Sequence, residues 1–228
     1  MEVMRNIKPL NNYLQKIRKL CNKKKIILIF DECTSGFRQS YGGLHKLYGV
    51  EPDMAVFGKA LGNGYAITAV IGSRGVMEAA QDTFISSTFW TERIGPTAGL
   101  KTLEVMEQMK SWEIITKTGL DINDKWRNLA KRHNLEISIS GLPALTSFSI
   151  KSAQALEYKT LITQEMLTKG YLATTSVFTC TEHTPEMIDG YFETLDGVFK
   201  MISECEQGRD VYELLNGPVC HSGFGRLN

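Results

Sequence analysis

The sequence has no long apolar run, no signal-peptide core and no excess of charge of one sign. None of its uninterrupted apolar stretches approaches the ~20 residues that a membrane-spanning helix needs. Its 228 residues carry a formal net charge of +1, so no global field attracts nucleic acid or an anionic membrane. Because residues 1–30 lack a signal-peptide core, we predict a cytoplasmic location and neither a membrane nor a nucleic-acid partner.

Motifs for disulfides and metals are missing as well. The five cysteines are an odd number, and no two of them have C-x-x-C spacing. This argues against a disulfide framework or a zinc knuckle and favours reduced thiols. The four histidines are scattered and show no H-E-x-x-H spacing, so we expect no metal site.

The first half of the sequence alternates helix-like and strand-like segments. Residues 13–21 place apolar side chains on one helical face. The following segment, KIILIF at 25–30, is typical of a strand buried on both faces, as in a parallel sheet. Apolar runs at 54–57 and 67–71 predict two more strands, and a helix is expected over 95–110. This alternation indicates an α/β domain.

The texture of the sequence changes beyond about residue 112. A pattern of alternating apolar residues, LEISISGLPALTSFSI, predicts a hairpin or meander. The segments expected on either side of it are helices at 118–133, 156–169 and 185–205 and a short strand at 171–177. We therefore predict a large α/β domain over 1–112 and a small α+β domain over 113–228.

An acidic pair, Asp31-Glu32, directly follows the first predicted strand. Two chemistries use an acid in this place: in nucleotide hydrolases it holds a metal, and in pyridoxal-phosphate enzymes it holds the cofactor's ring nitrogen. The hydrolase also needs a G-x-x-x-x-G-K-[ST] phosphate loop. The only Gly-Lys pair, Gly58-Lys59, is followed by Ala60, so the hydrolase is the least favoured interpretation. Strand alternation turns Glu32 away from Asp31 and predicts a structural role for it.

Lys59 directly follows the second predicted strand and precedes a glycine-rich turn. Most lysines in turns are simply solvated. At a strand end, however, partial desolvation lowers the pKa of a lysine, and its neutral amine can then act as a nucleophile toward aldehydes. Asp31 and Lys59 both stand at the carboxyl ends of strands, where α/β sheets bind their ligands. We therefore expect the two side chains to converge on one crevice.

These segments resemble the class III (subgroup II) pyridoxal-phosphate aminotransferases. The resemblance rests on LIFDECTSGFR, YGVEPDMAVFGKALGNGYAITAVIG, STF and GPTAGLKTLEVM, in that order. EHTPEMID and LLNGPVCHSGFGRLN are similar to the C-terminal region of the glutamate-1-semialdehyde 2,1-aminomutase branch. The resemblance covers essentially the whole chain. It implies the C-terminal part of a fold-type I large domain, which binds pyridoxal phosphate, followed by the small α+β domain.

The resemblance also implies roles for three residues. The lysine matching Lys59 forms the Schiff base with the aldehyde of pyridoxal 5'-phosphate and then carries a proton between substrate and cofactor. The aspartate matching Asp31 pairs with the protonated pyridine nitrogen, which makes the ring an electron sink for a carbanion at the substrate's α-carbon. The threonine matching Thr88 reaches the cofactor phosphate of the neighbouring subunit. Lys59 is thus the expected catalytic residue, and Asp31, Lys59 and Thr88 are the expected cofactor ligands, in a homodimer acting on a small amino or carbonyl substrate.

The sequence departs from the family pattern in two places. It begins where the pattern is already inside the large domain, and no glycine precedes Gly36 to form the glycine/serine-rich turn that cradles the cofactor phosphate. FWTERIGP also stands where the branch has a small glycine-asparagine-proline turn.

We therefore expect an N-terminally truncated chain that by itself binds pyridoxal phosphate weakly and turns over slowly or not at all. Its missing N-terminal half is expected on a separate chain if the enzyme is split; the alternative is a non-catalytic remnant. Asp31, Lys59 and Thr88 do not distinguish intramolecular amino-group transfer from intermolecular transamination.

Overall fold

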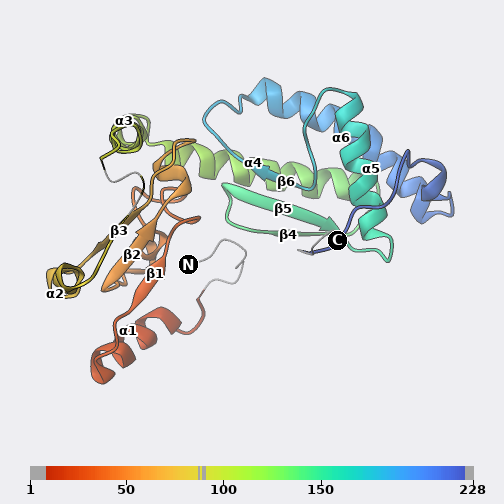
Figure 1. The fold of residues 1–228 in the computed structure, drawn as a ribbon. Coiled ribbons are helices and arrows are strands. Elements are labelled where there is room, and N and C mark those ends of the chain that lie inside the picture. Colours follow the sequence, from red (N-terminus) through yellow and green to blue (C-terminus); the bar gives the residue numbers. More distant parts are fainter. Residues whose placement is uncertain (1–8, 87, 89–90, 224–228) are drawn as a thin grey trace. The chain divides into compact units, whose positions relative to one another are not determined.

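The computed structural model describes residues 9–86, 88 and 91–223 of the chain (Figure 1). The chain divides into two compact units, Met1–Thr116 and Lys117–Asn228. Within the described residues, no helix is both long enough and apolar enough to cross a membrane.

The first unit is built on a three-stranded sheet in the order β1-β2-β3 (Figure 1). β1 (Ile29–Asp31) runs parallel to β2 (Met54–Phe57), and β2 runs antiparallel to β3 (Ala69–Gly72). Asp31 lies opposite Val56, so the carboxyl ends of β1 and β2 lie at the same edge of the sheet. The other elements are α1 (Tyr13–Lys24), α2 (Arg74–Met77), α3 (Ile94–Met109) and the 3-10 turns η1 (Leu44–Tyr48), η2 (Lys59–Leu61) and η3 (Glu78–Asp82).

One carboxylate connects α1 to the sheet. Asp53 Oδ2 accepts a hydrogen bond from the Leu28 N–H at 2.7 Å and from Arg18 Nη1 at 2.8 Å. The Leu28 N–H is the main cause that lowers the pKa of Asp53, and the Arg18 hydrogen bond acts in the same direction. Leu28 immediately precedes β1 and Asp53 immediately precedes β2, so this carboxylate aligns the starts of the two parallel strands.

The first strand is more exposed than the sequence predicted. Ile26, Ile27 and Ile29 are 54%, 49% and 52% exposed, whereas Phe30 is 6% exposed. The prediction that 25–30 is buried on both faces is therefore wrong for this structure. The physical reason is that, among the described residues, β1 pairs only with β2 and is covered on only one face.

One apolar cluster of the first unit lies between the sheet and α3. The rings of Phe37 and Phe57 are 5.4 Å apart, and Leu103 and Met106 of α3 contact the same cluster. The helix predicted over 95–110 is confirmed as α3. By packing on the cluster that contains Phe57, α3 supports the carboxyl end of β2, two residues before Lys59.

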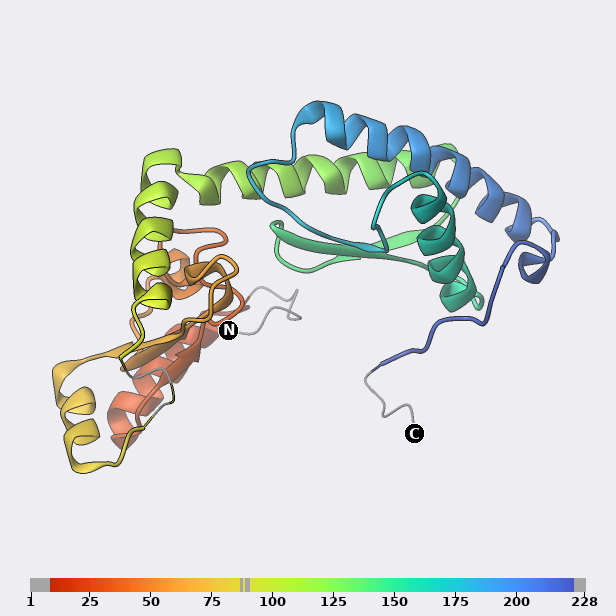
Figure 2. The same ribbon diagram turned by 45° about the horizontal axis from the view of Figure 1, so that its top comes forward.

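The second unit packs helices on an antiparallel sheet in the order β4-β5-β6 (Figure 2). The predicted hairpin is confirmed, with Ile137 opposite Ile150. Trp126 and Phe199 both contact Phe148, with ring centroids 4.7 and 5.7 Å away. Its elements are β4 (Ile137–Ser140), β5 (Leu145–Ile150), α5 (Ala155–Thr168), β6 (Ser176–Phe178), α6 (Pro185–Glu206) and η4 (Val211–Glu213); α4 (Ser111–Arg132) runs through the point where the two units divide.

Candidate cofactor site

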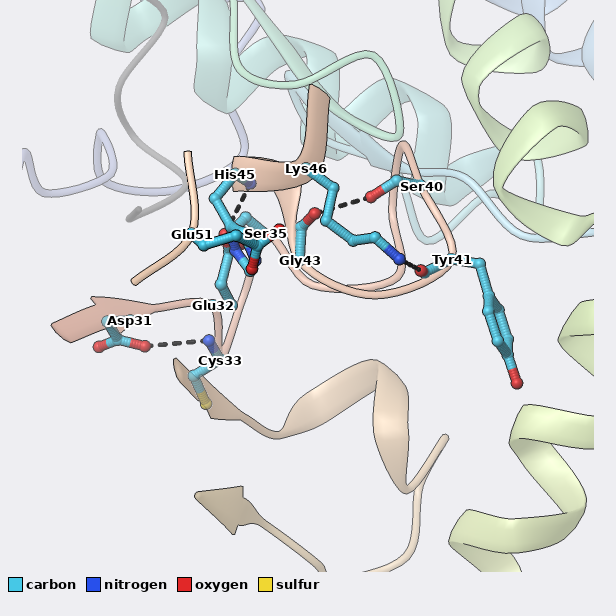
Figure 3. Close-up of polar contacts among 10 residues, drawn as sticks. All are labelled: Asp31, Glu32, Cys33, Ser35, Ser40, Tyr41, Gly43, His45, Lys46 and Glu51. Atoms are coloured by element: carbon cyan, nitrogen blue, oxygen red, sulfur yellow. Dashed lines mark hydrogen bonds and ion pairs between the residues drawn. The ribbon is translucent and has the colours of Figure 1, made fainter. Parts of the chain in front are cut away.

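Asp31 ends β1 at the carboxyl edge of the sheet and is exposed. Its Oδ1 accepts the Cys33 N–H at 2.9 Å (Figure 3). A carboxylate that bonds the backbone two residues on forms a turn, which here ends the strand. The chain then folds back over the end of β2.

Lys59 stands two residues after Phe57, the last residue of β2. Its backbone has φ +44°, in the left-handed region, where a non-glycine residue costs on the order of 1–2 kcal/mol. Its Nζ donates a hydrogen bond to Thr34 Oγ1 at 2.6 Å. Since Thr34 comes three residues after Asp31, the lysine of one strand meets the loop that leaves the neighbouring strand.

Gly58 allows this close approach. Its φ of −165° is extended backbone that any residue adopts, so conformation does not require a glycine here. Space does: a Cβ at this position would lie 2.7 Å from Cys33 Sγ and 3.4 Å from Thr68 Cγ2. The missing side chain lets the loop after Asp31 lie directly against the end of β2.

Glu32 points away from this edge into the protein interior. Its side chain is fully buried, and its Oε1 accepts hydrogen bonds from the His45 backbone N–H and from His45 Nδ1, each at 3.0 Å (Figure 3). Its Oε2 accepts a hydrogen bond from the Ser35 hydroxyl. We call Glu32, Ser35 and His45 the Glu32 clasp. The clasp satisfies a buried carboxylate, which is costly without partners, and gives Glu32 the structural role that strand alternation predicts.

Thr88 lies on a different element from the other two expected site residues. It is exposed, in a turn between η3 and α3. The sequence missed two contributors to the site region, Thr34 and His45. Thr34 carried no signal except its place in the small, polar turn after Asp31, and His45 counted only as one of four scattered histidines.

The groups at this edge fit pyridoxal phosphate chemically. A primary amine and an exposed carboxylate stand at the ends of adjacent parallel strands. A primary amine can bond to the cofactor's aldehyde carbon, and a carboxylate can pair with its protonated ring nitrogen. Among the described residues, no group of three or more His, Cys, Asp or Glu side chains is placed to hold a metal ion.

Comparison with known proteins then identifies the family. A family model described as aminotransferase class-III matches residues 6–188. The chain belongs to the class III aminotransferase family. This class III chain is 36% identical over 157 residues to a 3-aminobutyryl-CoA aminotransferase of Cloacimonas acidaminovorans, a match that covers 68% of this chain and 38% of that protein. It is 28% identical over 211 residues to a glutamate-1-semialdehyde 2,1-aminomutase of Methanocaldococcus jannaschii, a match that covers 85% of this chain and 49% of that protein. The predicted family is confirmed, and the predicted branch is among its relatives.

Two solved structures share the fold of this class III chain. The FumI protein of Sphingopyxis sp. MTA144, solved in its PLP internal aldimine form, superimposes with a TM-score of 0.81 at 22% identity, over 93% of this chain and 52% of that one. An ornithine aminotransferase of Toxoplasma gondii superimposes with a TM-score of 0.74 at 21% identity, over 87% of this chain and 49% of that one. The predicted α/β architecture of fold-type I transferases is confirmed. The chain spans about half the length of these proteins, and less of the 3-aminobutyryl-CoA aminotransferase.

Proposed function

We propose that this chain carries the cofactor-binding lysine and aspartate of a pyridoxal-phosphate enzyme. The enzyme moves an amino group between an amine donor and a carbonyl acceptor, or within one small substrate. The observation that carries the proposal is the contact of Lys59 Nζ with Thr34 Oγ1, at 2.6 Å. In this contact the Lys59 amine, which follows β2, lies against the loop that follows Asp31.

The proposed site residues have different roles. When bound, pyridoxal phosphate supplies the electron sink that makes the substrate's α-hydrogen acidic. The Lys59 amine would hold the cofactor at its aldehyde carbon and, as a free neutral amine, would accept the proton that leaves the substrate's α-carbon. The Asp31 carboxylate would hold the cofactor's ring nitrogen in its protonated form. The Thr88 hydroxyl would help to hold the cofactor phosphate of a neighbouring subunit in a homodimer.

The names of the relatives narrow the substrate class to small molecules with an amino group and a carbonyl. One relative is named as an aminotransferase and another as an aminomutase. Both activities need the same amine and carboxylate, so we keep both. Within this proposal, residues 1–112 belong to the large domain and 113–228 to the small domain of a cytoplasmic enzyme.

The test is an absorbance titration of the purified chain with pyridoxal phosphate, followed by borohydride reduction and peptide mapping. We expect an absorbance band shifted from that of the free aldehyde and a reduced adduct at Lys59. The adduct should disappear in Lys59→Arg and persist in the matched control Lys46→Arg, whose exposed amine donates to the Tyr41 carbonyl in the same unit. Adducts spread evenly over the surface lysines would contradict the proposal.

A further inference from the structure

The loop between Asp31 and Gly36 is held at nearly every residue. The Cys33 N–H donates to Asp31 Oδ1, and the Gly36 N–H donates to the Glu32 carbonyl at 2.8 Å. The Ser35 hydroxyl donates to the buried Glu32 carboxylate. The residues before and after Thr34 are therefore both held by hydrogen bonds.

The loop is also pressed against the end of β2. A Cβ on Gly36 would lie 2.7 Å from the Glu32 carbonyl oxygen and 2.7 Å from Phe57 Cδ1. Thr34 itself is 7% exposed. Its hydroxyl oxygen therefore has a nearly fixed position, and that position is 2.6 Å from Lys59 Nζ.

The Glu32 clasp extends this support across the sequence. His45 lies 13 residues after Glu32 and is 6% exposed, and it binds the Glu32 carboxylate through both its ring and its backbone (Figure 3). Its Nε2 lies 3.9 Å from the exposed carboxylate of Glu51. One buried carboxylate thus fixes the loop that presents Asp31 on one side and Thr34 on the other.

We propose that Thr34 is a positioning residue: its hydroxyl holds the Lys59 amine at the carboxyl edge of the sheet, and the Glu32 clasp holds Thr34. The inference rests on the proposed function. A lysine side chain has four carbons of rotatable stem, and reaction rates rise when a reacting group is held in its working geometry. The loop that carries the carboxylate for the ring nitrogen also tethers the amine for the aldehyde, so one piece of backbone sets the spacing of both groups.

The first arm of the test needs no cofactor. Acetic anhydride acetylates amines, and mass spectrometry gives the rate at Lys59 relative to the rate at Lys46. In Thr34→Val, which removes the hydroxyl and keeps the shape, Lys59 should react about threefold faster or more, because the amine has lost a hydrogen-bond partner. Thr34→Ser should restore the wild-type rate. The control Thr83→Val, whose exposed hydroxyl donates only to the local Ala80 carbonyl, should leave it unchanged.

The second arm uses pyridoxal phosphate. The yield of borohydride-trapped adduct at Lys59 should fall about tenfold in Thr34→Val and recover in Thr34→Ser, because the untethered amine no longer meets the aldehyde in a fixed geometry. His45→Gln should change both readouts in the same direction as Thr34→Val, although Thr34 is intact. A thermal unfolding curve confirms that each variant is folded, and Thr34→Ala replaces Thr34→Val if that variant is not.

The two arms separate the two proposals. An acetylation rate at Lys59 that is the same in wild type, Thr34→Val and Thr34→Ala overturns the positioning role, whatever pyridoxal phosphate does. A faster acetylation in Thr34→Val, together with no trapped adduct at Lys59 in the wild type, supports the positioning role and overturns the proposed function.

Discussion

Replacing Gly58 by alanine tests the close approach on which the site depends. The added methyl carbon would lie 2.7 Å from Cys33 Sγ, well inside the ordinary van der Waals distance. Cys33 has a single side-chain torsion, so relief requires either its rotation or a shift of the loop that carries Thr34. Overpacking of this kind costs ~1–3 kcal/mol. A shifted loop also separates the Thr34 hydroxyl from the Lys59 amine.

The assay is urea unfolding of Gly58→Ala beside two companions. Gly75→Ala is the matched control: Gly75 lies in α2, a Cβ there meets nothing within 4 Å, and alanine favours helix, so its midpoint should stay or rise. The double variant Gly58→Ala/Cys33→Ala removes the clashing sulfur and should regain most of the lost stability. Because a change of midpoint at constant slope reports stability, the three midpoints are directly comparable. A Gly58→Ala variant as stable as the wild type, or a double variant no better than Gly58→Ala, would refute the reasoning.

Three further predictions concern stability. His45→Ala leaves the buried Glu32 carboxylate without its ring partner and should lower the free energy of unfolding by ~3 kcal/mol, measured in urea. An unchanged urea midpoint would show that the Glu32 clasp does not stabilise the fold. The folded-state pKa of Asp53 is lowered, so its contribution to stability is present above the unfolded value of about 4 and is lost as pH falls through the folded value. Asp53→Asn should therefore be less stable than the wild type at pH 7, and the gap should close in acid; a gap that is constant with pH would contradict this assignment. Phe148→Ala should cost ~3–5 kcal/mol, whereas the exposed Phe178→Ala should cost less than ~0.5 kcal/mol; equal losses would mean that the ring cluster around Phe148 is not the core of the second unit.

Local patterns were enough for most of the fold. The helical periodicity over 95–110 and the alternation in LEISISGLPALTSFSI each depend on neighbours within a few residues, and both elements form where they were predicted. Periodicity failed for 25–30, because an apolar run says that a strand has two apolar faces and not whether anything covers them. Whether β1 is central or at an edge depends on how many strands pair with it.

For the site, the sequence alone determined which chemical groups the chain offers. An acid after one apolar run, a lysine after the next, and the motifs around them lead to the family and to Asp31 and Lys59 as candidates. Only the tertiary structure decided what those groups touch. Thr34 and Lys59 are 25 residues apart, and Glu32 and His45 are 13 apart. The first contact forms because parallel pairing of β1 with β2 brings two loops together at one edge, and because Gly58 has no side chain to keep them apart. The second lies within the connection between β1 and β2, where Gly43 has no side chain to displace the His45 ring.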